Sequence, residues 1–232
     1  MISKTAELYD LIYFHKNYSS EAAYISEIIK RHNPSASSLL DVACGTGRHL
    51  EFLSGQYSVE GIDLDPGVLE IARQRLPNVK FTEADMTEFV LGRKFHAVVC
   101  LFSGVAYVET VARLNQAVDS MAKHLTPEGI LIVEPWVIPE AWRPGNVDAV
   151  FIEEPSLKLT RMARSEVRGG VSVLDIQYLI GTPDEIRHER EEHRLGLFSH
   201  EQYQAAFEGS GLTVIHDLEG LIGRGLYVGT KK

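Results

Sequence analysis

Short apolar runs alternate with amphipathic stretches from the start of the chain to about Pro135. An amphipathic helix pattern lies at residues 20–32. It is followed by strand-like runs at 39–43, 58–63, 78–81, 95–101 and 129–134. Strands that alternate with helices are typical of a parallel sheet covered on both faces. The pattern predicts an α/β fold with a doubly wound, mostly parallel sheet and a ligand site at the carboxyl ends of its strands.

The alternation stops after Trp136. Residues 171–180 form a long strand-like run between glycine-containing turns, which predicts an inserted antiparallel β layer at about 137–197. A capping box formed by Ser199 and Gln202 then predicts a helix.

Two further strand-like runs, at 213–215 and 226–228, close the chain. With the five earlier runs they predict a seven-stranded sheet. We expect residues 1–232 to form a single domain.

Bulk properties narrow the possible partners. With 232 residues and 44% hydrophobic content the chain is long enough for a sizeable core, and its net charge of −9 argues against nucleic-acid binding. It contains no apolar run long enough to cross a membrane and no signal-peptide pattern. Cys44 and Cys100 look like small buried residues. We therefore expect a cytoplasmic protein without membrane or nucleic-acid partners.

A glycine turn follows the first strand, with Asp41 and Ala43 leading into Gly45 and Gly47. Leu50 occupies the position where a dinucleotide fingerprint has its third glycine, which weakens an NAD-dependent oxidoreductase reading. An acid at this strand end repels a pyrophosphate but suits a cationic ligand. S-adenosylmethionine, which carries an ammonium and a sulfonium, is the expected cofactor.

Two further acids follow in the order that such a site requires. Asp63 ends the second strand, where a carboxylate can bind a ribose diol. Asp85 follows the third strand and can accept the adenine amino hydrogens, while Met86 packs on the ring. Leu64 and Leu101 are assigned to the same site. Each acid alone is also explained as a helix cap or a solvated strand end, but the ordered set favours cofactor binding.

These motifs resemble the class I methyltransferases, which have a loop like 41–47, an acid like Asp63 and an Asp-Met pair like Asp85-Met86. The chain is also similar to bacterial N,N-dimethyltransferases that act on the amine of dTDP-linked deoxyamino sugars. Segments that carry this similarity are 39–47, 92–95, 133–136, 197–198, 201–203 and 223–226. The resemblance implies a Rossmann-like methyltransferase fold, S-adenosylmethionine and a nucleotide-sugar substrate.

Aromatic residues near the N-terminus are implied by the resemblance to fold over the pocket, Tyr18 against the cofactor and Tyr9 and Tyr13 against the substrate. They are equally explained as the apolar face of a covering helix. An aromatic residue found further upstream in the family has no counterpart here, which leaves lid closure open.

The loop after the fourth strand faces the methyl donor in this fold. We assign Phe102 and Ser103 to substrate binding and Tyr107 to contact with the substrate amine. An aromatic residue packed under the sheet is the alternative for Tyr107.

Three residues further along the chain complete the expected substrate site. Glu134 ends the fifth strand and can attract a cationic amine, and Trp136 can pack on a sugar or base. Arg224, between two glycines, can reach a diphosphate. A strand-capping acid and a core tryptophan are the alternatives for Glu134 and Trp136, with function slightly favoured, and a hairpin-flank arginine explains Arg224 equally well.

The inserted layer contains two clusters of charged residues. Arg161, Arg164 and Arg168 could meet one pyrophosphate or form a solvated surface. His188 and His193 are five residues apart, one more than a helical zinc pair needs, and on a strand they face opposite sides. We therefore predict no metal site.

Methyl transfer from a sulfonium to nitrogen is an in-line displacement, in which positioning supplies most of the acceleration. We expect Tyr107 or Glu134 to orient the amine. The alternatives are a methyltransferase for another small amine or hydroxyl and a non-catalytic S-adenosylmethionine-binding protein. The inserted layer could also serve as a homodimer face.

Overall fold

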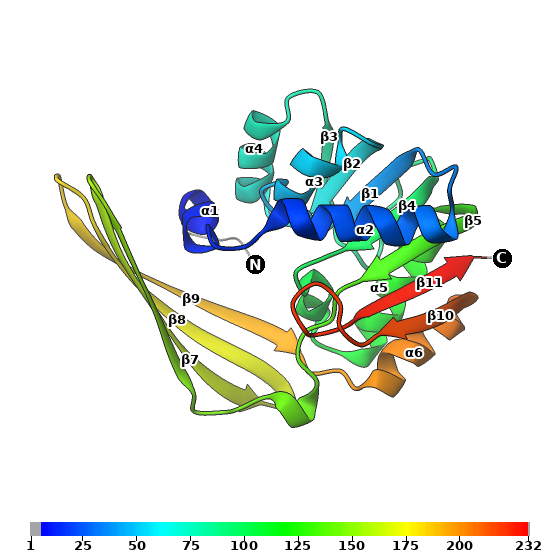
Figure 1. Cartoon of the computed structure of the whole chain (residues 1–232). Helices are drawn as coiled ribbons and strands as arrows, with labels where there is room; N and C mark the ends of the chain where they lie inside the picture. Colours follow the sequence, from blue (N-terminus) through cyan, green and yellow to red (C-terminus); the bar gives the residue numbers. More distant parts are fainter. Residues whose placement is uncertain (1–5, 232) are drawn as a thin grey trace.

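The chain is built around a seven-stranded sheet in the computed structural model, which describes residues 6–231. Six strands run in one direction, and β11 is antiparallel to both of its neighbours. Figure 1 shows this sheet on the right of the molecule. Across the sheet the strands are β10 (Leu212–Asp217), β11 (Leu226–Lys231), β5 (Leu125–Val133), β4 (Phe95–Cys100), β1 (Ser38–Val42), β2 (Ser58–Asp63) and β3 (Lys80–Glu83).

Helices cover both faces of this sheet (Figure 1). On one face lie α2 (Tyr18–His32), α3 (Arg48–Leu53) and α4 (Pro66–Arg75), and on the other lie α5 (Val111–Lys123) and α6 (His200–Gly209). All five residues of β1 are buried, because consecutive side chains point into the two opposite cores. The carboxyl ends of the parallel strands remain available for a ligand site.

A second sheet is formed by four antiparallel strands in sequence order: β6 (Val147–Glu154), β7 (Leu157–Arg168), β8 (Val171–Gly181) and β9 (Ile186–Gly196). One face carries apolar residues that pack against Leu8 and Ile12 near the N-terminus. Those two residues belong to η1 (Ala6–Leu8) and α1 (Tyr9–Ile12). Figure 1 shows α1 beside this sheet, at the end of the molecule where the parallel strands terminate.

The predicted architecture is confirmed: a mostly parallel seven-stranded sheet with a separate antiparallel layer. The capping box of Ser199 and Gln202 is present at the start of α6. Boundaries differ at β5, which begins at Leu125 rather than 129 and has a register irregularity against β4. The antiparallel strands occupy 147–196 of the expected 137–197, because η3 (Pro139–Ala141) and a turn precede β6. Within residues 6–231, no helix is long and apolar enough to span a bilayer.

Candidate active site

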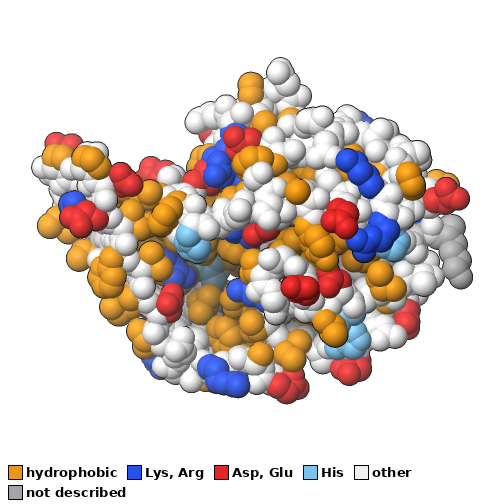
Figure 2. Space-filling model, viewed as in Figure 1, with side chains coloured by type: hydrophobic (Ala, Val, Ile, Leu, Met, Phe, Trp, Pro, Cys, Tyr) orange, Lys and Arg blue, Asp and Glu red, His pale blue; other side chains and the backbone are white. Residues whose placement is uncertain are grey.

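A cavity of about 410 Å³ opens where the parallel strands end, between the N-terminal segment and the second sheet. This volume lies within the usual range for small-molecule sites. Figure 2 shows the hollow, with apolar, basic and histidine side chains around it. A smaller cavity adjoins it and is lined by Tyr18, Asp41 and His49.

The glycine turn after β1 has a left-handed backbone at three positions. Ala43, Gly45 and Gly47 have φ angles of 58°, 54° and 77°. A Cβ on Gly45 would meet nothing within 4 Å, so the turn presents open space to the cavity. Gly47 does not line either cavity; it is the N-cap residue before α3, and a Cβ there would lie 3.4 Å from that of Ala72. Gly47 therefore shapes the turn and its packing.

Two acids meet at the ends of β1 and β2. Asp63 lines the main cavity and accepts a hydrogen bond from the Gly45 N–H at 2.8 Å. Asp41 is 2% exposed and lines the adjoining cavity. Burial, with a further contribution from the Asp63 charge, raises the pKa of Asp41 well above its usual range. A bound cation would favour ionisation of both groups.

The third predicted acid is held at the cavity rim. Asp85 accepts hydrogen bonds from the N–H and the hydroxyl of Thr87, and it pairs with Arg113 of α5 at 2.8 Å. Burial alone would raise the pKa of Asp85, but these contacts outweigh it and lower the pKa. Met86 and Leu64 line the cavity nearby, and Leu101 lines both cavities. Arg113 lies on a helix face, where no sequence signal marks it.

The loop after β4 has a strained backbone beside the cavity. Phe102 and Ser103 have φ angles of 51° and 62°, which side chains rarely adopt. The Ser103 hydroxyl donates to the Pro135 carbonyl at 2.8 Å and accepts from Arg224 at 2.9 Å. Arg224 also lies over the Trp136 ring, 4.4 Å from its centroid. The structure thus brings Ser103, Trp136 and Arg224 together in the cavity wall.

Glu134 lies behind this loop and does not line either cavity. It is fully buried, and its Oε2 accepts a hydrogen bond from the Phe102 N–H at 2.6 Å. Burial raises the pKa of Glu134 above its ordinary value. Its contact supports the strained turn, and its proposed contact with the amine stays a prediction.

The N-terminal tyrosines line the two cavities. The rings of Tyr9 and Tyr13 lie 4.8 Å apart, and Tyr13 meets Phe102 edge-on at 5.0 Å. Both tyrosines line the main cavity. Tyr18 lies in the adjoining cavity, edge-on to His49 at 4.9 Å.

A sequence profile for a methyltransferase domain matches residues 39–129. The dTDP-3-amino-3,6-dideoxy-alpha-D-glucopyranose N,N-dimethyltransferase of Streptomyces fradiae is 42% identical over 228 residues, covering 97% of this chain and 89% of that protein. The chain belongs to this family of N,N-dimethyltransferases. It is a class I S-adenosylmethionine-dependent methyltransferase.

Solved structures agree with this assignment. DesVI of Streptomyces venezuelae is 38% identical with a TM-score of 0.94, and the match covers 100% of both chains. An amino pentose methyltransferase from Micromonospora echinaspora, solved with S-adenosylmethionine bound, is 38% identical with a TM-score of 0.89 over 97% of each chain.

The residues of this methyltransferase fit S-adenosylmethionine. Asp63 retains free acceptor capacity for ribose hydroxyls, because a carboxylate oxygen accepts more than one hydrogen bond. Asp41, buried with a raised pKa, favours a cationic group beside it. The open side of Gly45 lets a ligand approach the backbone.

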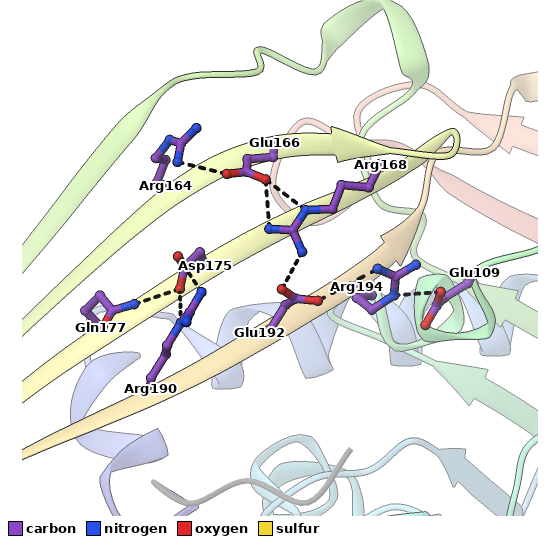
Figure 3. Close-up of polar contacts among 9 residues, drawn as sticks. All are labelled: Glu109, Arg164, Glu166, Arg168, Asp175, Gln177, Arg190, Glu192 and Arg194. Carbon is purple, nitrogen blue, oxygen red and sulfur yellow. Dashed lines mark hydrogen bonds and ion pairs between the residues drawn. The ribbon is translucent and has the colours of Figure 1, made fainter.

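The arginine cluster expected from the sequence is divided between two faces of the second sheet. Arg161 lines the cavity, whereas Arg164 and Arg168 lie on the opposite face of β7, three and seven residues later. Figure 3 shows both pairing with Glu166 on that outer face. Strand alternation separates them, so they cannot meet one pyrophosphate. The methyltransferase cavity also contains inward residues of β8 and β9 that sequence reasoning missed: Tyr178, Glu191 and His193. Arg194 lines the cavity as well, although strand alternation puts it on the same side of β9 as Glu192.

Proposed function

We propose that this methyltransferase adds two methyl groups to the amine of a dTDP-linked 3-amino-dideoxyhexose. The full-length 42% identity to the Streptomyces fradiae enzyme carries this proposal. The wall formed by Arg224 and Trp136 supports it, because a guanidinium pairs with diphosphate oxygens and an indole face packs on a base or sugar.

The cofactor supplies an electrophilic methyl group when it is bound. The protein residues must hold the amine nitrogen in line with that methyl group, and such positioning accounts for much of the rate. The N-terminal tyrosines and the loop at 101–107 line the cavity, and we propose that they exclude water when the ligands are bound. Tyr107, which lines the cavity, is proposed to orient the amine. The substrate ammonium must lose a proton before its nitrogen can react.

The decisive experiment is mass spectrometry of the purified protein with S-adenosylmethionine and a dTDP-3-amino-3,6-dideoxyhexose. We expect a product that has gained two methyl groups. The 4-amino isomer, run in parallel, tests the position of the amine. Methylation only of unrelated amines or hydroxyls would contradict the nucleotide-sugar proposal, and cofactor binding without turnover on any acceptor would indicate a non-catalytic protein.

The Arg224→Gln variant tests the diphosphate contact. We expect KM for the nucleotide sugar to rise by about 10-fold or more with cofactor affinity unchanged, because a charge-assisted contact is lost. Arg164→Gln, on the outer face of β7, is the matched control. Equal KM values for both variants would contradict the assignment of Arg224.

We also propose that the protein works as a cytoplasmic homodimer that pairs through the outer face of the second sheet. Phe151, Met162 and Leu179 are exposed there, on strand positions that share one face. Apolar side chains gathered on one surface favour protein contact.

A further inference from the structure

Three polar side chains form a continuous hydrogen-bonded row in the cavity wall. The Tyr107 hydroxyl lies 2.6 Å from His193 Nδ1, and His193 Nε2 lies 3.2 Å from a Glu191 carboxylate oxygen. Tyr107 belongs to η2 (Gly104–Val108), whereas the other two are inward-facing residues of β9. All three line the main cavity. The row therefore joins the loop that faces the methyl donor to the second sheet.

The contacts assign one proton arrangement to this row. A carboxylate only accepts hydrogen bonds, so His193 Nε2 carries the ring proton and donates it to Glu191. Nδ1 is then the acceptor for the Tyr107 O–H. The phenol oxygen retains a lone pair that can accept a proton from a ligand in the cavity.

Charged and titratable groups from several elements lie beside the row. Tyr178 of β8 donates to Glu191 at 3.4 Å, and Arg161 of β7 and Tyr13 of the N-terminal segment line the same cavity. Arg194 pairs with Glu109 at 3.0 Å, a second bridge between β9 and the end of η2 that Figure 3 shows. This ion pair holds the two elements in register beside the Tyr107–His193 contact.

The environment suits proton transfer through the row. Burial, followed by the nearby Tyr13 and Asp63, raises the pKa of Tyr107 above its ordinary value. The phenol therefore keeps its proton at neutral pH, so it acts by accepting a proton from the ligand while it gives its own proton to His193. The His193 side chain is 23% exposed, which gives it contact with solvent for release of the proton.

We propose that Tyr107, His193 and Glu191 form a relay that removes a proton from the substrate ammonium before each methyl transfer. An N–H bond of the ammonium breaks and its proton binds the Tyr107 oxygen, while the phenol proton moves to His193 Nδ1. The resulting imidazolium is stabilised by Glu191. The freed lone pair on nitrogen forms the N–C bond as the C–S bond breaks, with its electron pair remaining on sulfur. Tyr107 is a catalytic residue in this relay, and the other two act through it.

This relay rests on the proposed function, so wild-type turnover of the amino sugar is measured first. We then compare kcat for wild type, Tyr107→Phe, His193→Asn and Glu191→Gln from about pH 6.5 to 10. Each variant is expected to lose roughly 10²-fold at pH 7, where the amine arrives protonated. The loss should shrink toward unity near pH 10, where most of the amine is already neutral in solution. The control is His188→Asn, an exposed histidine on the outer face of β9.

The pH dependence separates proton transfer from a structural role. An equal loss at every pH, or no loss in any variant, overturns the relay. The double variant Tyr107→Phe/His193→Asn should be no slower than Tyr107→Phe alone, because serial groups act as one unit. Cofactor affinity of each variant reports folding, and Glu191→Gln keeps the test decisive if His193→Asn does not fold. Wild-type inactivity on the sugar would instead overturn the proposed function, and the relay with it.

Discussion

At the scale of single residues, the expected cofactor side of the site contains two largely buried acids. Asp41 and Asp63 end neighbouring strands of the sheet, and burial raises the pKa of each. Backbone N–H groups of Gly45 and Asp65 oppose this shift at Asp63. A cationic ligand therefore gains from both carboxyl groups, and the site favours S-adenosylmethionine over an anionic nucleotide.

Substitution Asp63→Asn should weaken S-adenosylmethionine binding by about 10- to 100-fold, since a hydrogen bond to a charged group contributes roughly 1.5–3 kcal/mol. Isothermal titration calorimetry measures this change directly. Asp184→Asn, an exposed carboxylate in the turn between β8 and β9, should bind the cofactor as wild type does. Unchanged affinity in Asp63→Asn would remove this residue from the cofactor site.

The positions of site residues were predictable where a local motif marked them. Asp63 and Asp85 follow strand ends in a fixed order, and the structure places both at the cavity. His193 carries no such signal. Strand periodicity shows that it shares a face with Glu191, but it does not tell which face is inward or that Tyr107, 86 residues away in the chain, lies beside it.

At the scale of elements, a buried polar cluster connects the N-terminal segment to α3, the helix that follows the glycine turn. Glu21 of α2 contacts His49 of α3 at 2.8 Å and also pairs with Lys16. Lys16 in turn lies 4.4 Å from the centre of the Phe102 ring. One cluster thus connects two helices with the strained loop beside the substrate site.

Low pH should weaken this contact between Glu21 and His49. Burial lowers the pKa of His49 below its usual value, although Glu21 partly opposes the shift. As the pH drops, His49 of the unfolded chain binds a proton near pH 6.5, whereas His49 of the folded protein stays neutral to lower pH. The free energy of unfolding therefore falls as the pH drops from about 7 to 5. The His49→Gln variant should show a flatter fall, by at most about 1.4 kcal/mol per pH unit.

Urea denaturation at several pH values measures this slope, with His188→Gln as the control for an exposed histidine. Parallel curves for wild type and His49→Gln would show that His49 is protonated equally in the folded and unfolded chains.

The start of a helix can be predicted from the sequence where neighbouring residues form its cap. The start of α4 shows this, since the Asp65 side chain accepts from the Gly67 N–H and the proline at 66 fits the first turn. The start of β5 was not predictable. Its first residues, 125–128, contain a proline and a residue with φ of 58°, and they join the sheet through an irregular pairing with β4.

At the scale of the whole molecule, the second sheet has two distinct faces. Its inner face forms one wall of the cavity, and its outer face combines exposed apolar residues with the ion pairs of Figure 3. Hydrophobic periodicity predicts that such a layer exists. It does not predict where the layer packs, because that depends on contacts with Leu8 and Ile12, more than 130 residues earlier in the chain.

The proposed homodimer is tested on this outer face. Phe151 is 74% exposed, and Phe151→Glu would place a charge in the apolar contact. Sedimentation velocity should show a dimer for wild type and a monomer for this variant. Val90→Glu, an exposed site on the main body, is the control. A wild-type monomer at tens of micromolar would contradict the dimer.

The alternation along β7, β8 and β9 has a consequence for engineering and for divergence. Alternate residues of each strand lie on opposite faces of the sheet. One set lines the cavity and the other set lies on the outer face. A library of variants that randomises only the cavity-facing residues of β7, β8 and β9 could be screened for activity on new acceptor molecules. The outer face of this sheet and the parallel sheet would stay unchanged. Substitutions at the inward positions therefore change the wall of the cavity, whereas substitutions at the outward positions change the face of the proposed dimer contact.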